Sequence, residues 1–209
     1  MNHYSLVKAD FNQTYQDTID QAITEYEQIF SLSLNQKICF IYLHSREQFD
    51  DVMGRKTKPF ETAYSNQNFI FLMHPGVFEQ ESNKKYDEQK TILTLRHEVC
   101  HKFFQHAAWR TRPTWLNEGT CIYFSGQLKN FIYPKKFSEF LLFSDKNAVG
   151  NKTVYPESGF VVEKLVSKFG QDKFIDFLKS LRNSSQESFP HHFKNFFGFE
   201  LNYDNINNL

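Results

Sequence analysis

The chain has 209 residues with 24 basic and 24 acidic side chains, so it carries no formal net charge at neutral pH. This length suits one domain, or one domain in two lobes, with a substantial buried core. Because no excess of charge attracts phosphate groups, the composition argues against a nucleic-acid-binding protein and against recruitment to anionic membranes by overall charge. The 24 phenylalanines predict a core rich in aromatic rings.

The three cysteines, Cys39, Cys100 and Cys121, are an odd number without paired spacing, which is not a disulfide framework. We expect small buried thiols in a reducing compartment. The first residues lack the apolar segment of a signal peptide, and no window of about 18 residues is apolar enough for a membrane helix. The sequence therefore predicts a cytoplasmic protein without a membrane span.

The first half of the chain alternates predicted helices with predicted strands. Helical spacing of apolar residues distinguishes the helices, and runs of β-branched and aromatic residues distinguish the strands. In chain order the elements are a helix over 11–30, a strand over 37–43, a short helix from Ser45 to Gly54, a strand or hairpin arm over 62–73 and a helix over 88–108. Ser45 and Gln48 form a capping box for the short helix.

The second half predicts helices only. They cover 114–127, 134–143, 156–169, 171–182 and 188–197. Pro134 and Pro156 are placed where helices begin, and Gly170 is placed where one ends. Strands with helices first and helices alone afterwards indicate an α+β fold.

Residues 97–101 read HEVCH, on the helix expected over 88–108. Positions i and i+4 of a helix share one face about 5–6 Å apart, so His97 and His101 can direct imidazole nitrogens at one ion. Glu98 is offset from them by about 100° around the helix, which suits contact with metal-activated water better than ligation. The signature is that of zinc hydrolases, with two histidine ligands and a glutamate as general base.

A catalytic zinc needs a third protein ligand. Glu118, sixteen residues after His101 on the next predicted helix, lies in an otherwise apolar segment where a carboxylate is costly without a cation or a partner. His106 points away from the face shared by the two motif histidines, and Cys100 lies on the wrong face. We therefore expect Glu118 to complete the ligand set.

HEVCH followed by WLNEG at 115–119 resembles the gluzincin metallopeptidases, the superfamily of thermolysin and the zinc aminopeptidases. The resemblance covers roughly 37–182. It implies a zincin-like α+β fold in a single domain, 1–209. A small twisted sheet and the active-site helix form an upper lobe over about 1–109, and a helical lower lobe covers about 110–209, with one zinc ion per chain in the cleft between them.

The resemblance also implies roles for individual residues. His97, His101 and Glu118 match the zinc ligands, and Glu98 matches the general base. Tyr155, in the stretch YPESG, is the best match to the lower-lobe residue that stabilises the oxyanion in this superfamily. The implied substrate is a peptide or protein.

Two departures from the family pattern are visible. The Gly-x-Met-Glu-Asn motif, with which aminopeptidases hold a free amine, is absent, and this favours an endopeptidase. The thermolysin branch has an aspartate four residues after its glutamate ligand, whereas Ile122 stands here. Support for the histidines must then come from elsewhere, with Asn117 or backbone carbonyls as candidates.

Two other functions fit the same motifs. One is a zinc hydrolase of a non-peptide amide, which could use the same site. The other is a non-catalytic, zinc-stabilised module that binds a partner, and this would require a fourth protein ligand to close the metal site.

Overall fold

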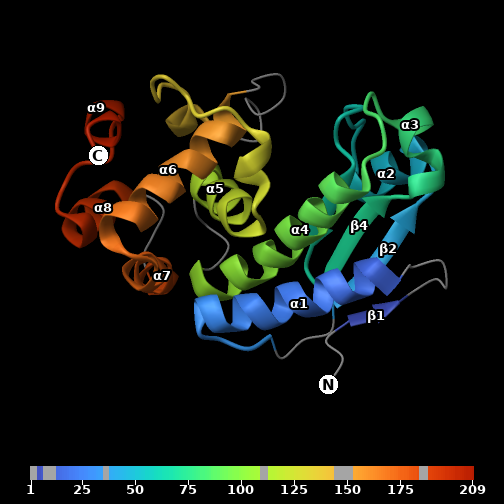
Figure 1. Ribbon diagram of the computed structural model, residues 1–209, viewed down its shortest axis with the longest axis horizontal. Helices are drawn as coiled ribbons and strands as arrows, with labels where there is room; N and C mark the ends of the chain where they lie inside the picture. The colour runs from blue at the N-terminus through green and yellow to red at the C-terminus, as the bar shows by residue number, and fades with distance from the viewer. Residues whose placement is uncertain (1–3, 7–12, 35–37, 109–112, 144–152, 184–187) are drawn as a thin grey trace. The chain divides into compact units, whose positions relative to one another are not determined.

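The computed structural model describes residues 4–6, 13–34, 38–108, 113–143, 153–183 and 188–209 (Figure 1). The chain divides into two compact units, the first formed by 1–24 and 33–99 and the second by 25–32 and 100–209. Helices α1 (Gln13–Phe30) and α4 (Glu88–Ala108) each contribute residues to both units. The single domain with a lobe boundary at about 109–110 stays a prediction.

A four-stranded sheet in the order β1-β2-β4-β3 forms the centre of the first unit. Its strands are β1 (Tyr4–Leu6), β2 (Ile38–Leu43), β3 (Ala63–Asn66) and β4 (Phe69–Met73). β2 pairs in parallel with β1 and β4, whereas β3 and β4 are antiparallel. The arm predicted over 62–73 is thus a hairpin, with Gln67 in the left-handed conformation at its turn (φ 47°).

Helix α2 (Arg46–Met53) covers one face of the sheet. Phe49 of the helix packs against Leu43 and Met73, which alternate on their strands with residues that face the other way. The helix begins as predicted, because the Ser45 side chain accepts a hydrogen bond from the Gln48 amide, and it ends at Gly54 with φ 64°. Two shorter helical segments follow β4, a 3-10 turn over Pro75–Val77 and α3 (Phe78–Glu81).

Helices α1 and α4 run side by side (Figure 1). Within the second unit, the rings of Tyr26 and Phe30 on α1 both contact Phe103 on α4, with centroid distances of 5.7 and 5.8 Å. All three rings are buried. This aromatic contact holds the part of α4 that follows the HEVCH motif against α1.

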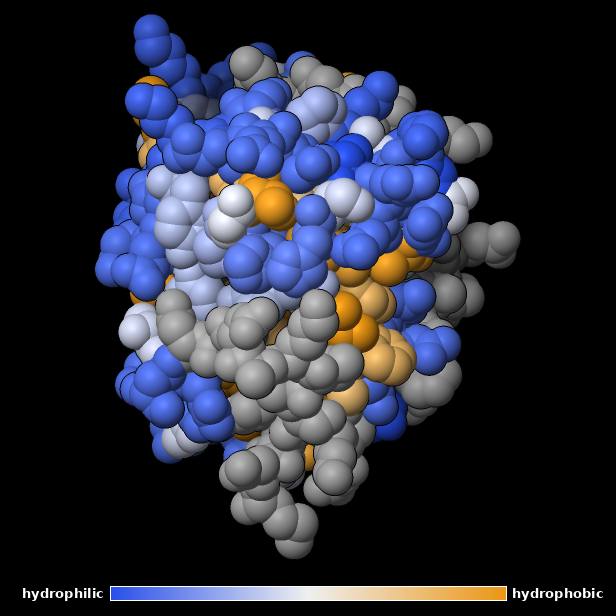
Figure 2. Space-filling view, turned by 90° about the vertical axis from the view of Figure 1, so that its right-hand side faces the viewer, coloured by the Kyte–Doolittle hydropathy of each residue, from blue (hydrophilic) through white to orange (hydrophobic). Residues whose placement is uncertain are grey.

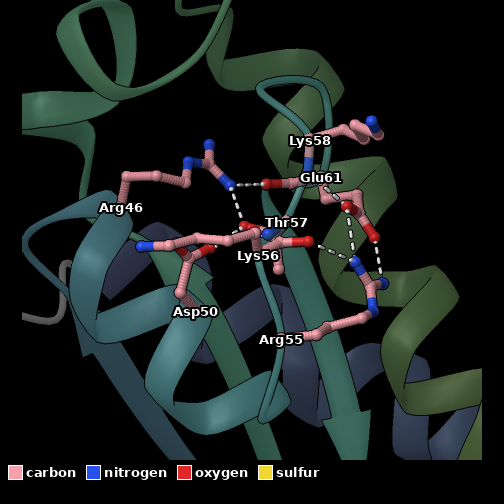
Figure 3. Close-up of polar contacts among 7 residues, drawn as sticks. All are labelled: Arg46, Asp50, Arg55, Lys56, Thr57, Lys58 and Glu61. Atoms are coloured by element: carbon pink, nitrogen blue, oxygen red, sulfur yellow. Dashed lines mark hydrogen bonds and ion pairs between the residues drawn. The ribbon is translucent and has the colours of Figure 1, made fainter.

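The segment between α2 and edge strand β3 is held by charged side chains (Figure 3). The Arg46 guanidinium donates hydrogen bonds to the backbone oxygens of Glu61 (2.7 Å) and Pro59 (3.2 Å). Arg55 pairs with the Glu61 carboxylate at 2.5 Å. Because these bonds reach the backbone just before β3, they set where the edge strand begins.

Asp50 of α2 secures the same segment from the helix side. Its Oδ1 accepts hydrogen bonds from the Thr57 amide (2.7 Å) and hydroxyl (2.6 Å), and Lys56 lies 3.1 Å from Oδ2. The bonds from Thr57, followed by the pairing with Lys56, lower the pKa of Asp50 from 3.8 to about 2. Asp50 is therefore a structural carboxylate that stabilises the fold in its ionised form.

Replacing Asp50 with asparagine should reduce stability at neutral pH and flatten the acid limb of the stability curve. The folded-state pKa lies below the unfolded value, so the stabilisation is fully present above about pH 4 and is lost as the pH falls toward 2. Thermal unfolding by circular dichroism across this range measures the effect. Asp51→Asn, at the exposed neighbouring position, is the control. Equal acid sensitivity of Asp50→Asn and the wild type would contradict the assignment.

The second unit is helical. After α4 it contains α5 (Thr114–Ser125), α6 (Val154–Phe169), α7 (Gln171–Ser180), α8 (Phe189–Phe197) and α9 (Tyr203–Asn207). The most extensive packing joins α5 to α6. Glycine is required there, because a Cβ at Gly119 would collide with the backbone oxygen of Ser158, and one at Gly159 would lie 2.5 Å from Ile122 Cγ2.

The helix predicted over 134–143 does not form; only a 3-10 turn over Phe140–Leu142 is present. The backbone amides of Ser138, Glu139 and Phe140 all donate to the buried Glu157 carboxylate, at 2.6–3.0 Å. The Phe137 amide donates to Asn207 Oδ1 instead (2.8 Å). Distant side chains therefore take the amides that a helix would bond internally.

The general prediction of a mixed α and β fold is confirmed. Apart from the grey residues, most of the surface visible in Figure 2 is hydrophilic, and hydrophobic residues gather on one part of it. Among the described helices, none combines the length and the apolar character needed to cross a bilayer.

Candidate metal centre

The HEVCH motif lies in the second half of α4, within one regular helix as its spacing predicts. His97, Glu98 and His101 are 8%, 8% and 7% exposed, which is unusual for polar side chains on a helix. Apolar neighbours Val99, Cys100 and Phe103 on the same helix are buried as well. Burying three polar side chains within one helix turn costs free energy unless they have hydrogen-bond partners or bind an ion.

These three side chains form a group that could hold a metal ion. One donor atom from each of His97, Glu98 and His101 lies within 4.8 Å of the other two. It is the one such group in the part of the chain that the structure describes. The Glu98 carboxylate is thus close enough to the imidazoles to reach a water molecule held beside them.

Glu118, the predicted third ligand, is not a member of this group, but its carboxylate approaches His101. Its Oε1 is 3.6 Å from His101 Nε2, which is too long for a hydrogen bond. Two donor atoms that share a tetrahedral ion at metal distances of 2.0–2.2 Å should be about 3.3–3.6 Å apart. The separation is therefore close to that expected for two ligands of one ion.

The other nitrogen of the His101 ring is occupied by α5. His101 Nδ1 lies 2.9 Å from Asn117 Oδ1 and 3.2 Å from Cys121 Sγ. An amide oxygen can only accept, so Nδ1 carries the proton. Nε2, the nitrogen that a neutral ring of this tautomer offers to a metal ion, faces Glu118.

Helix α5 presents these groups because of where it begins and what it packs against. It starts directly after Pro113, and Trp115 and Leu116 in its first turn are buried. The Trp115 ring meets Phe140 edge-on at 5.2 Å. Asn117 and Cys121 are four residues apart and share a helix face.

Sequence reasoning named Asn117 as a candidate support but treated Cys121 as core only. The thiol is fully buried, as predicted, yet its sulfur also contacts the ring nitrogen of His101. The i, i+4 spacing from Asn117 was the available signal. Ile122, at the position of the family's aspartate, is buried in the α5–α6 contact.

Tyr155 lies in the first turn of α6, which begins at Val154, two residues before the predicted start. Its ring meets Phe143 edge-on at 4.6 Å, and the side chain is half-buried. Three residues further on, the Ser158 oxygen makes the close approach to Gly119, the residue after Glu118. The part of α6 that follows its first turn thus packs on α5 directly after Glu118.

The weaker ligand candidates stay outside the group. His106 lies in the last turn of α4, where burial and then the charge of Arg182 lower its pKa. Cys100 is completely buried.

A comparison with models of protein families found no match, and a comparison with curated protein sequences found none either. Support for a metal centre therefore comes from the side chains and their geometry.

Asn117→Ala should weaken the binding of zinc, used as the test ion, by about 10–100-fold, because the His101 ring loses the acceptor that fixes its tautomer. Competition with a chromophoric chelator measures the affinity. Asn117→Asp keeps an acceptor at this position and should retain most of the affinity. Asn130→Ala, at an exposed position, is the matched control. Unchanged zinc affinity in a folded Asn117→Ala variant would contradict the support assigned to this residue.

Proposed function

We propose that the protein is a zinc-dependent metallopeptidase of the gluzincin type, with His97, His101 and Glu118 as the ligands of one zinc ion per chain. The observation that supports this most strongly is the environment of His101. Its Nδ1 is engaged by Asn117, and its Nε2 lies 3.6 Å from the Glu118 carboxylate.

The donor set favours zinc over other metals. Two imidazoles and one carboxylate suit zinc, and they leave one coordination position for water or substrate, as in catalytic rather than structural sites. Magnesium and calcium prefer oxygen ligands throughout.

Glu98 is the proposed general base. When bound, zinc acidifies water and polarises the carbonyl that water attacks. Glu98 accepts a proton from the attacking water and then delivers it to the leaving amine of the cleaved peptide bond. Its buried position beside the imidazoles supports this role, because a carboxylate there is close to the reacting atoms and screened from bulk water.

Tyr155 is the proposed donor to the developing oxyanion. Its hydroxyl would stabilise negative charge that is absent from the substrate's ground state. The close packing of α6 on α5 at Ser158, three residues after Tyr155, supports this role. The ring contact with Phe143 holds the aromatic part of the side chain.

The proposed substrate is an internal segment of a peptide or protein chain. The stretch before the motif helix, AYSNQNFIF at 63–71, lacks the motif that binds a free amine and forms the β3–β4 hairpin. β3 is one of the two outer strands of the described sheet, so an extended peptide could add to it by backbone hydrogen bonds.

Glu98→Gln should bind one zinc ion per chain as the wild type does and lose peptide cleavage by about 10²–10⁴-fold, because the amide cannot accept the proton. Metal analysis and cleavage of an unfolded protein, with and without 1,10-phenanthroline, measure the two properties. Glu88→Gln, at an exposed position on the same helix, is the control.

The outcomes separate the possible functions. Equal cleavage by Glu98→Gln and the wild type would eliminate Glu98 as the base. A wild-type protein that binds zinc but cleaves no member of a broad peptide library would be a non-peptide amidase or a binding module instead.

Tyr155→Phe should reduce kcat by about 10²-fold with little change in zinc content, because only the oxyanion donor is removed while the ring contact with Phe143 remains. Steady-state kinetics on a fluorogenic peptide measures the effect, with Tyr123→Phe on α5 as the control. A kcat equal to that of the wild type would show that Tyr155 only packs beside the helix.

A further inference from the structure

Three consecutive apolar side chains are exposed in the second unit, after α5. Phe131, Ile132 and Tyr133 are 37%, 92% and 49% exposed, and we call residues 131–133 the apolar tip. Single exposed apolar side chains are common on proteins, but three in succession, one of them almost fully exposed, indicate a surface that contacts something apolar.

Lysines surround the apolar tip in the sequence. Lys129, Lys135 and Lys136 are exposed, and the stretch 126–138 contains no acidic residue. The chain as a whole is neutral, so this stretch is a local concentration of positive charge. Acidic groups lie at its edges: burial and then the charge of Glu163 raise the pKa of Tyr133, and the Glu157 carboxylate accepts a hydrogen bond from the Ser138 amide.

The apolar tip is held in place by its own side chains. The Tyr133 ring packs against Phe137 at 5.9 Å and Phe160 at 4.9 Å. The Phe131 amide donates to the Leu128 oxygen at 2.9 Å, which closes the turn that leads into the tip.

The segment that follows is also fixed to the fold. Asn207 accepts a hydrogen bond from the Phe137 amide and donates one to the Phe137 oxygen, at 2.8 and 3.0 Å. The buried Glu157 carboxylate accepts the next three amides. Ile132 is therefore exposed next to a segment whose backbone is held by hydrogen bonds. Because this segment is already ordered, binding through it costs less conformational entropy.

We propose that the apolar tip is an interfacial anchor that binds the surface of an anionic lipid bilayer. Ile132 and Phe131 enter the boundary between headgroups and acyl chains, Tyr133 lies at headgroup level, and Lys129, Lys135 and Lys136 face lipid phosphates. Aromatic and aliphatic side chains beside lysines are the composition of membrane-surface anchors. Protein–protein interfaces, by contrast, are depleted in lysine.

This inference does not depend on the metal centre, and its test measures binding to lipid rather than catalysis. The wild-type protein should sediment with vesicles of phosphatidylcholine and phosphatidylserine and remain in solution with vesicles of phosphatidylcholine alone. Binding should weaken as salt rises, because the lysine contribution is screened. Absence of binding to the anionic vesicles overturns the proposal and leaves a protein partner for this surface.

Variants identify the contact residues. Ile132→Ser should weaken vesicle binding by about tenfold, because the bound protein loses an isoleucine side chain that is inserted in the bilayer. Lys135→Gln/Lys136→Gln should weaken it by about fivefold per lysine. The matched controls in the first unit are Phe60→Ser, which removes an exposed aromatic ring, and Lys58→Gln/Lys85→Gln, which removes the same charge. Equal binding by the test and control variants overturns the assignment to residues 129–136.

A second measurement reports insertion directly. Ile132→Trp should show blue-shifted emission on anionic vesicles and quenching by brominated lipids, measured against the two native tryptophans of the wild type. Emission that does not change on vesicle binding would overturn the insertion of Ile132. Thermal unfolding of each variant verifies that the fold is retained.

Discussion

The contacts of the two His101 ring nitrogens constrain the position of α5. Nδ1 meets Asn117 and Cys121, and Nε2 faces Glu118. Consecutive helix residues diverge by about 100°, so Asn117 and Glu118 cannot meet one atom, but they can meet two nitrogens on different sides of one ring. This arrangement fixes both the register of α5 along α4 and the tautomer of the imidazole. The close packing of α6 at Gly119, directly after Glu118, then holds the carboxylate turn in place.

Four carboxylates of the described residues illustrate two different uses, two that accept hydrogen bonds from backbone amides and two that lie near histidines. Glu157 is buried and accepts hydrogen bonds from three backbone amides. Asp50 accepts hydrogen bonds from Thr57, and these bonds lower its pKa. Both accept hydrogen bonds from backbone amides in segments that are neither helix nor strand over most of their length. Glu98 and Glu118 instead lie beside imidazoles, where a carboxylate can serve a cation or accept a proton. Burial alone does not separate the two classes; the neighbouring donors do.

Local sequence patterns predicted much of the fold. The helix at 88–108, the cap at Ser45 and the stop at Gly54 all agree with the structure, because each depends on side chains within a few residues. The strands of the β3–β4 hairpin were predicted as one arm, since the turn at Gln67 carries no glycine to mark it. The predicted helix at 134–143 was wrong, because its amides are taken by Glu157 and Asn207, about twenty and seventy residues away.

The sequence by itself determined that His97 and His101 share one face of a helix with Glu98 beside them, because their spacing matches the helix period and needs no distant contact. It also indicated Glu118 as the next candidate, from the cost of a carboxylate in an apolar segment. Only the tertiary structure decided how α5 meets His101: Asn117 and Cys121 both contact Nδ1, and the Glu118 carboxylate lies 3.6 Å from Nε2. The reason is physical, because contacts between helices depend on packing at positions such as Gly119, and no local period encodes that packing.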